Sequence, residues 1–276
     1  MLRVGWFSTA RGDSSRNLLN SVFTSIQNKD LDASIEYVFC SRERGESPKT
    51  DLFIEQVKSY QIPLLCLSVR KYAEMFHEKI AASDEILPPW RLEYDRQVMK
   101  LLEPFRVDIC LLAGYMLIVG QEMCEKYDMI NLHPALPNGP KGTWQEVIWQ
   151  LISNYATESG VMIHLVTPQL DRGPVVTFCR YPITGNAFNK LWDEIKGYEL
   201  EKIKIEQGEN NELFKRIRRE GFIRETPLII ETLKALSYGD IKISNKSIFD
   251  RTGKQIKGFD VTDRIDKLIS KCKYIE

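Results

Sequence analysis

The sequence predicts an α/β protein: a mainly parallel, twisted sheet with helices on both faces, as in Rossmann-like folds. Short apolar runs alternate with segments of helical spacing along the first 182 residues, and this alternation is typical of parallel sheets. Two later apolar runs, 129–131 and 161–166, lead into polar groups beside proline or glycine, as strands do when their carboxyl ends carry a site. We expect a core over residues 1–182 and a small α/β appendage over 183–276 that packs on it.

The first half of the chain contains five expected strands and five expected helices. Each strand is a short apolar run, and each helix repeats apolar residues every three to four positions. The expected strands are 2–8, 35–40, 62–67, 109–113 and 129–131, and the expected helices run from Asn17 to Ile26 and over 51–60, 72–82, 92–102 and 121–127.

The second half begins with an expected helix over 144–155, which Thr143 can cap, and with strands over 161–166 and 175–181. The charged segment 186–220 is expected either to pack over a site or against a second subunit of a homodimer, or to be a solvated arm. The remaining expected elements are a helix over 227–237, a hairpin over 240–259 with its turn at 250–253, and a terminal helix over 263–272.

Composition excludes several classes of protein. Lys+Arg and Asp+Glu both number 38, so nothing in the global charge favours nucleic acid or an acidic membrane as partner. No apolar run approaches the roughly 20 residues of a spanning helix, and the N-terminus lacks the features of a signal peptide. The six cysteines are scattered without CxxC spacing, so we expect buried thiols in a cytoplasmic protein and no metal site.

Three polar residues at the ends of the expected strands could form a catalytic group. The amide of Asn131 can donate to an oxyanion, the imidazole of His133 can carry a proton, and the carboxylate of Asp171 can hold the imidazole. The alternatives are a structural histidine and a turn-capping aspartate. We expect His164, inside an apolar run, to be structural and His77 to lie on a helix surface.

Two glycine positions suggest ligand contacts. The turn 9–17 is rich in glycine and serine and precedes a helix, so its backbone N–H groups could bind an anion with help from the helix dipole. It matches neither GxGxxG nor the Walker A motif, and a plain capped turn is the alternative. Gly114 directly follows the most apolar strand, where a glycine permits a tight turn or the close approach of a ligand.

Four segments in this order resemble one known family. They are the helix with Tyr94-Asp95, residues 108–116 (Asp-Ile-Cys-Leu-Leu-Ala-Gly-Tyr-Met), residues 131–137 (Asn-Leu-His-Pro-Ala-Leu-Pro) and residues 165–175 (Leu-Val-Thr-Pro-Gln-Leu-Asp-Arg-Gly-Pro-Val). Together they resemble the folate-dependent formyltransferases, and most of all the glycinamide ribonucleotide (GAR) transformylase branch. The resemblance covers residues 1–182 and resumes near residues 227–230 and 239–243. Asn-x-His-Pro followed by Leu-Asp-x-Gly-Pro is specific, whereas each half alone is not.

The resemblance implies a reaction and a set of site residues. A formyl group would move from 10-formyltetrahydrofolate, a co-substrate, to a primary amine without a metal, and residues 1–182 would be the catalytic core. Asn131, His133 and Asp171 match the catalytic trio. The expected folate contacts are Gly114, Tyr115, Met116, Leu117, Ile118, Val119 and Val166. The expected contacts to the phosphate of the amine are Gly12, Ser14, Ser15, Arg16 and Asn17.

Two departures from the family leave the acceptor amine open. Trp144 stands near a segment that often contains histidine. The family's acid that recognises the glycinamide amine has no clean match, since Phe222 falls there with Glu220 and Glu225 nearby. GAR, in purine biosynthesis, is the first candidate. An amino sugar nucleotide or another phosphorylated amine is the alternative. Methionyl-tRNA fits less well because no basic appendage is evident. A folate hydrolase would not need the phosphate loop, and a non-catalytic folate-binding module would have no chemical reason to keep all three polar groups.

Overall fold

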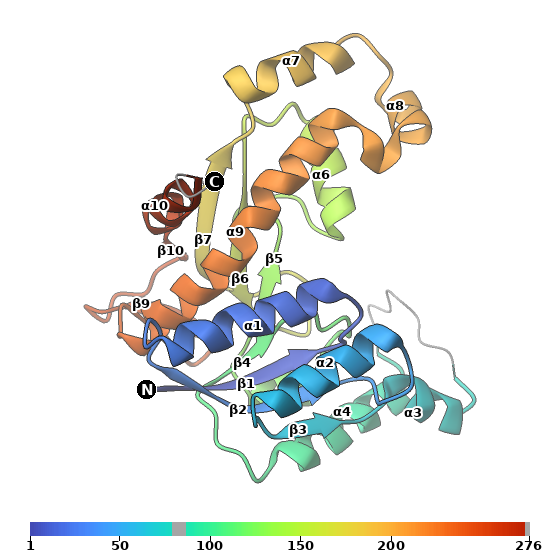
Figure 1. The fold of residues 1–276 in the computed structure, drawn as a ribbon, viewed down its shortest axis with the longest axis vertical. Helices are drawn as coiled ribbons and strands as arrows, with labels where there is room; N and C mark the ends of the chain where they lie inside the picture. The colour runs from blue at the N-terminus through green and yellow to red at the C-terminus, as the bar shows by residue number, and fades with distance from the viewer. Residues whose placement is uncertain (79–86, 274–276) are drawn as a thin grey trace. The chain divides into compact units, whose positions relative to one another are not determined.

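The structure, a computed structural model, describes residues 1–78 and 87–273 (Figure 1). Its strands are β1 (Leu2–Ser8), β2 (Ala33–Cys40), β3 (Leu64–Cys66), β4 (Ile109–Leu112), β5 (Met129–His133), β6 (Glu158–Leu165), β7 (Val175–Pro182), β8 (Ile241–Ser244), β9 (Ser247–Asp250) and β10 (Phe259–Asp260). Its helices are α1 (Asp13–Gln27), α2 (Pro48–Ser59), α3 (Val69–Met75), α4 (Pro89–Leu102), α5 (Gln121–Lys126), α6 (Trp144–Ser153), α7 (Asn186–Ile195), α8 (Leu200–Glu206), the short 3₁₀ helix η1 (Gly208–Asn210), α9 (Glu212–Ser237) and α10 (Thr262–Lys273).

The predicted α/β class is confirmed. Eight strands form one sheet in the order β10-β7-β6-β5-β4-β1-β2-β3, and β8 pairs with β9 in a separate hairpin. The pairs β1–β2, β1–β4, β2–β3, β4–β5 and β7–β10 are parallel. The chain divides into two compact units. The first comprises Met1–Asn131, His164–Pro174 and Leu233–Gln255, and the second comprises the remaining described residues.

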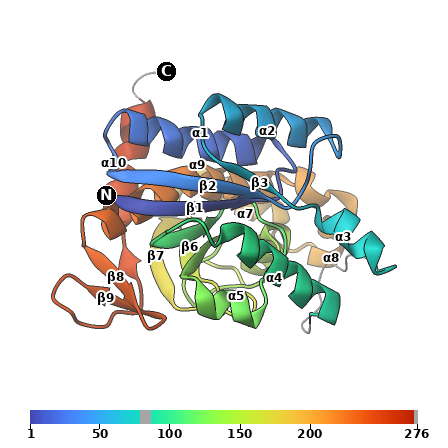
Figure 2. The same cartoon turned by 90° about the horizontal axis from the view of Figure 1, so that it is seen from below.

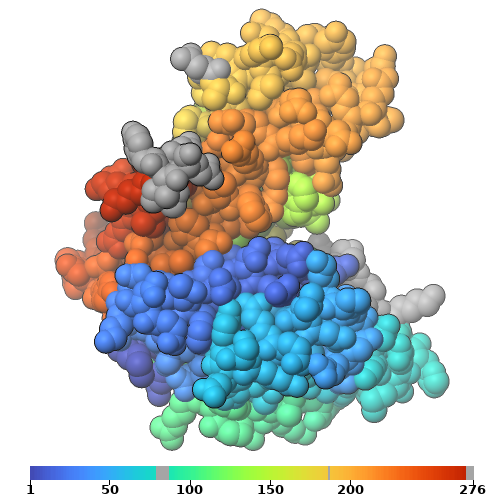
Figure 3. All heavy atoms as spheres, viewed as in Figure 1, coloured from blue at the N-terminus to red at the C-terminus, as the bar shows by residue number. Residues whose placement is uncertain are grey.

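The first unit is a parallel sheet between two helical layers. Helices α1 and α2 cover one face of β1, β2 and β3, and α4 and α5 lie on the other (Figures 1 and 2). The atoms of α1 and α2 form one continuous surface in Figure 3. On the α4 side, Phe7, Tyr37, Phe39 and Tyr94 are fully buried, and the Phe7 and Tyr37 rings meet edge to face with centroids 5.9 Å apart. This burial explains why the first strands read as continuous apolar runs.

The second unit is built around α6 and α9. Helix α6 begins as predicted, because Thr143 and Glu146 form a capping box: each side chain accepts a hydrogen bond from the other residue's backbone N–H. Val147, Trp149 and Leu151 of α6 pack into one apolar cluster with Phe214 of α9.

Helix α9 is longer than predicted, since it begins at Glu212 and passes through Pro227, where we expected a helix to start. A proline inside a helix removes one backbone hydrogen bond. Leu213 and Ile217 before the proline and Leu228 and Leu233 after it are buried, and this burial offsets the loss.

Two other predicted boundaries were wrong. Helix α1 starts at Asp13 with Gly12 as its N-cap, so the expected loop 9–17 ends five residues earlier than we predicted. The hairpin turn lies at Asn245 and Lys246, which both adopt positive φ and suit a tight two-residue turn, and not at 250–253. The 250–253 turn exists but follows the hairpin, and Phe259 joins the main sheet.

Helix α3 ends at Met75, and residues 79–82 of the helix expected over 72–82 lie outside the described residues. In the second unit, the charged segment 186–220 forms α7, α8, η1 and the start of α9.

Among residues 1–78 and 87–273, no helix combines the length and apolar character that crossing a bilayer needs. The five cysteines whose side chains are described (40, 66, 110, 124 and 179) are free thiols, and four of them are buried.

The starts of β1 and β4 are joined by an ion pair that makes stability depend on pH. Arg3 donates to Asp108 from its backbone N–H at 2.8 Å and from its guanidinium at 2.6 Å, and the hydrogen bond to the guanidinium, more than any other contact, lowers the pKa of Asp108. A lowered carboxyl pKa stabilises the fold above the unfolded-state pKa, and that stabilisation is lost as the pH falls through the folded-state pKa.

We therefore expect Asp108→Asn to lower the thermal midpoint at neutral pH, with the difference from wild type shrinking as the pH falls below about 4. Melting curves at several pH values test this, and a difference that is constant with pH would contradict it.

Candidate active site

The carboxyl ends of β1 and β4 are joined by hydrogen bonds between the loops that follow them. The backbone N–H of Thr9 donates to the Gly114 carbonyl at 3.0 Å, and that of Met116 donates to the Thr9 hydroxyl at 2.8 Å. Gly114 has φ +70°, and a Cβ there would lie 2.9 Å from the Ser15 hydroxyl. The loop after β4 thus needs glycine for its conformation and for close approach to α1.

The expected folate stretch divides into core and surface residues. Tyr115 and Val119 are 8% and 3% exposed and belong to the core of the first unit, whereas Met116 is 62% exposed. Leu117, Ile118 and Val166 are partly buried. Tyr115 and Val119 are therefore core residues, and the folate contacts of Gly114, Met116, Leu117, Ile118 and Val166 stay a prediction.

A buried ion pair on α4, which we did not predict from the sequence, is hydrogen-bonded to the backbone at the end of this stretch. Arg91 and Asp95 lie one turn apart on α4 with their nearest atoms 3.3 Å apart. Arg91 also donates to the Ile118 carbonyl at 2.9 Å, and Asp95 accepts the Gly120 N–H at 2.7 Å. Desolvation by burial raises the pKa of Asp95, and the charge of Arg91 opposes that rise. The sequence signal that could have indicated this ion pair is two opposite charges four residues apart within an apolar helical pattern.

Asp171 lies in the loop 166–174 between β6 and β7, beside His164. The His164 Nε2 atom lies 3.5 Å from Asp171 Oδ1, and Nδ1 of the same ring lies 2.9 Å from the Leu165 carbonyl. Both side chains are at least 90% buried, at 4% and 10% exposed. Gly173 closes the turn, since a Cβ there would lie 1.7 Å from the Leu165 carbonyl oxygen. The structure thus gives His164, which we expected to be purely structural, a contact with a predicted site residue.

Asn131 and His133 occupy alternate positions of β5, so their side chains leave the strand on the same face. Asn131 belongs to the first unit and pairs with Leu112 of β4. His133 belongs to the second unit, is 2% exposed, and its Nε2 atom lies 3.0 Å from the Pro140 carbonyl. Because His133 and Asp171 fall in different units, their predicted pairing stays a prediction.

The five expected phosphate contacts lie at the start of α1. Gly12 is the N-cap and makes no side-chain cap bond, and Ser15 is buried. The neighbouring Asp13 carboxylate pairs with Lys49 at 2.5 Å, and this bond lowers its pKa. A helix N-terminus offers backbone N–H groups to an anion, and the phosphate contact expected at this turn stays a prediction.

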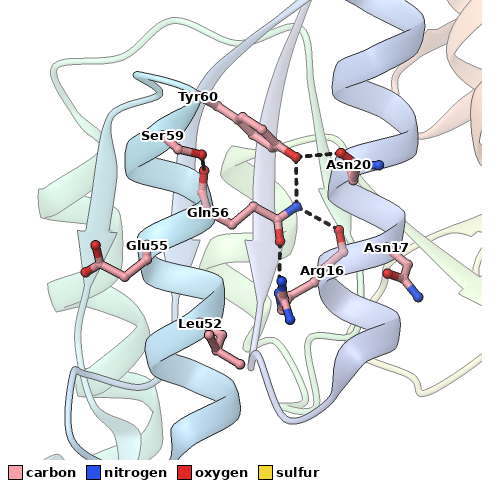
Figure 4. A pocket seen from close by; sticks show the side chains of 8 residues that line it. All are labelled: Arg16, Asn17, Asn20, Leu52, Glu55, Gln56, Ser59 and Tyr60. Atoms are coloured by element: carbon pink, nitrogen blue, oxygen red, sulfur yellow. Dashed lines mark hydrogen bonds between the residues drawn. The ribbon is translucent and has the colours of Figure 1, made fainter.

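Arg16 faces the neighbouring helix. Its Nε–H donates to the Gln56 side chain at 3.1 Å, and the Gln56 amide donates back to the Arg16 carbonyl at 3.0 Å (Figure 4). Arg16 and Asn17 line a groove between α1 and α2 of about 530 Å³. The Arg16 guanidinium therefore has one protein partner on α2, Gln56, and a second on α1, Asp13, 3.7 Å away, and its phosphate contact stays a prediction.

The two positions that depart from the family lie close together in the second unit. The Arg218 guanidinium stacks between two rings, 4.6 Å from the centroid of Trp144 and 5.0 Å from that of Phe222. Arg218 also donates to Glu225 at 2.5 Å. Phe222 is 48% exposed. Phe222, where we expected the family's acid, is thus an aromatic ring beside a cation.

Among the described residues, no group of three or more His, Cys, Asp or Glu side chains is arranged to hold a metal ion.

Comparisons with known proteins give the family. Residues 15–191 match the model of the family described as formyl transferase. The phosphoribosylglycinamide formyltransferase of Dictyostelium discoideum is 26% identical over 175 residues, which cover 60% of this chain and 78% of that protein. The Escherichia coli protein of the same name is 32% identical over 95 residues, or 34% of this chain and 44% of that one.

Solved structures show the same fold. A phosphoribosylglycinamide formyltransferase from Coxiella burnetii aligns with TM-score 0.63 and 21% identity over 94% of this chain and 98% of that one. A formyltetrahydrofolate deformylase from Pseudomonas syringae aligns with TM-score 0.59 and 18% identity over 90% of this chain and 65% of that one. The match over residues 15–191 covers more than half of the chain and contains every residue expected to touch the formyl group, and on this ground the chain belongs to the formyl transferase family.

Proposed function

We propose that this protein transfers the formyl group of 10-formyltetrahydrofolate to a primary amine, with glycinamide ribonucleotide as the acceptor, in purine biosynthesis. The observation that carries the proposal is the family match, which spans Asn131, His133 and Asp171 in one alignment. The names of the Dictyostelium discoideum and Escherichia coli relatives support the acceptor. Release of formate from the same folate is the second candidate function. The Pseudomonas syringae deformylase structure covers 90% of this chain, against 94% for the Coxiella burnetii structure.

The proposed reaction is an acyl transfer between two nitrogens. The acceptor amine attacks the formyl carbon, N10 of the folate leaves, and one proton moves from the amine to N10. The Asn131 N–H and a protonated His133 would stabilise the tetrahedral oxyanion, each donor contributing about 3–4 kcal/mol in a dry site. Asp171 would favour the imidazolium and carry the proton between the nitrogens through water.

His164 would position the Asp171 carboxylate. Its Nε2 atom lies 3.5 Å from Asp171 Oδ1, while Nδ1 lies 2.9 Å from the Leu165 carbonyl, so both ring nitrogens have neighbours that fix the ring beside the carboxylate.

The ligands would occupy two loops of the first unit. The exposed side of residues 114–118, with Val166, offers apolar surface and backbone groups to the folate pterin. The N-terminus of α1, with Gly12, Ser14, Ser15, Arg16 and Asn17, would bind the phosphate of the amine. In the second unit, the Arg218 guanidinium lies over the Phe222 ring, and this departure from the family leaves the acceptor amine open.

The test is to incubate the protein with 10-formyltetrahydrofolate carrying a labelled formyl group, with and without glycinamide ribonucleotide. We expect the label on the amine, and tetrahydrofolate release that depends on the acceptor. His133→Asn should lower the rate roughly 10²–10⁴-fold. The matched control is His77→Asn, an exposed position after α3, which should keep the wild-type rate.

Three outcomes would separate the alternatives. Labelled formate released equally with and without amine would identify a hydrolase. Transfer to an amino sugar nucleotide but not to glycinamide ribonucleotide would change the acceptor and keep the reaction. Folate binding without turnover on any phosphorylated amine would leave a binding module and refute the proposal.

A further inference from the structure

Two cysteines lie directly opposite each other at the ends of neighbouring strands. Cys40 ends β2 and Cys66 ends β3, and they are register partners in a parallel pair. Neighbouring strands lie about 4.7–4.9 Å apart, and register partners in a parallel pair project on the same face. That separation falls within the roughly 4.4–6.8 Å between Cα atoms that a disulfide can bridge.

The two thiols differ in character. The interaction between them lowers the pKa of Cys66 and raises the pKa of Cys40. Burial and the charge of Glu43 oppose the lowering of the Cys66 pKa, and the charge of Lys58 supports it. Cys40 is fully buried, whereas Cys66 is partly exposed. An accessible thiol of lowered pKa beside a second thiol is the arrangement found at cysteines that undergo reversible oxidation.

We propose that Cys40 and Cys66 form a reversible intrachain disulfide by exchange with a low-molecular-weight disulfide such as oxidised glutathione, and that this bond loosens the loop after β1. The Cys66 thiolate attacks one sulfur of the oxidised glutathione, forming a mixed disulfide and releasing one glutathione thiolate. Cys40 then attacks the Cys66 sulfur, forms the intrachain bond and releases the second glutathione. Each glutathione takes up one proton, so both cysteines are oxidised and one disulfide is reduced to two thiols.

The disulfide would affect the loop after β1 because Ser41, the residue after Cys40, is hydrogen-bonded to that loop. The Ser41 N–H donates to the Ser8 carbonyl at 3.1 Å, and the Ser41 hydroxyl donates to the Thr9 hydroxyl at 3.0 Å. The same Thr9 hydroxyl accepts the Met116 N–H at 2.8 Å. An S–S bond of about 2.05 Å fixes the side-chain torsions of both cysteines, and the adjustment of the backbone at Cys40 moves Ser41.

The experiment uses the full chain in glutathione mixtures of increasing oxidised fraction. Free thiols are counted after denaturation, and peptides are identified by mass spectrometry. We expect two of the six thiols to be lost together, one cross-linked peptide pair containing Cys40 and Cys66, and full recovery with dithiothreitol. Six thiols that persist in oxidised glutathione alone, or a bond between other cysteines, would overturn the proposal.

Variants separate the two steps. Cys66→Ser should keep its remaining thiols reduced, whereas Cys40→Ser should accumulate glutathione on Cys66, because the second attack is missing. The matched control is Cys179→Ala, a buried thiol of the second unit, which should still lose two thiols. If Cys40→Ser does not fold, Cys66→Ser, a substitution at a partly exposed position, still tests the pairing. Loss of two thiols in Cys66→Ser would refute a bond between Cys40 and Cys66.

Hydrogen exchange tests the second half of the proposal without any assay of activity. In the oxidised chain the Met116 amide should exchange about tenfold faster, since Thr9 no longer holds it, while the Ile130 amide inside β5 stays protected. Cys66→Ser should show no such change in glutathione. Equal protection of Met116 in the reduced and oxidised chains would show that the bond does not reach the loop.

Discussion

Asp171→Asn is expected to lower kcat/KM for formyl transfer roughly 10²–10⁴-fold, with folate affinity nearly unchanged. The substitution keeps the shape of the side chain but removes the charge that would favour a cationic imidazole, and it interrupts the path of the proton. Folate binding should survive because the proposed pocket consists mostly of apolar side chains and backbone between Gly114 and Ile118. The measurements are steady-state kinetics and folate binding on a variant whose thermal midpoint matches the wild type.

A double-mutant cycle shows which imidazole acts with Asp171. If Asp171 and His133 act as one unit, His133→Asn should cost about as much as Asp171→Asn, and the double variant little more. His164, with its Nε2 atom 3.5 Å from Asp171, should act only by positioning the carboxylate. His164→Asn should therefore lower kcat less than His133→Asn and leave KM for the folate unchanged. Additive losses of kcat/KM at His133 and Asp171, or a nearly active Asp171→Asn enzyme, would contradict the mechanism.

Arg91→Met is expected to cost about 3–5 kcal/mol of stability, the largest loss we predict for a single substitution. Asp95 is 3% exposed, and without Arg91 its charge would stay buried and uncompensated. The Ile118 carbonyl would also lose the donor that fixes the expected folate stretch. Urea unfolding gives the free energy, and any variant that stays folded should bind folate more weakly.

The charge on Asp95 can be separated from the loss of Arg91 packing. Asp95→Asn keeps an oxygen for the Gly120 N–H but carries no charge, so the double variant Arg91→Met/Asp95→Asn should be more stable than Arg91→Met alone. Burial already raises the pKa of Asp95. A raised carboxyl pKa destabilises the fold as the pH rises through that range, so the deficit of Arg91→Met should shrink on acidification. A deficit that is the same at all pH values and in the double variant would assign the loss to packing alone.

The fold class and the family follow from patterns that are local in the sequence. Alternating apolar runs and helical spacing require a layered α/β structure, because each amphipathic element must bury its face against a sheet. The Asn-x-His-Pro and Leu-Asp-x-Gly-Pro segments carried the family, since their order and spacing are chemically specific. Local rules also placed the start of α6, where Thr143 and Glu146 satisfy each other's backbone N–H groups without help from distant residues.

The contacts that support the site join residues far apart in the chain, and they became visible in the folded structure. The sequence shows that His164 and Asp171 are seven residues apart, but their contact depends on the path of the loop 166–174, which passes close to the Leu165 carbonyl at Gly173. Sequence patterns do not indicate that Arg91 donates to the Ile118 carbonyl, 27 residues away. Nor do they indicate that Cys40 of β2 pairs with Cys66 of the neighbouring strand β3. Helix α9 runs through Pro227 because burial on both sides of the proline outweighs a local rule. These features depend on partners distant in sequence, and periodicity and motif spacing carry no information about such partners.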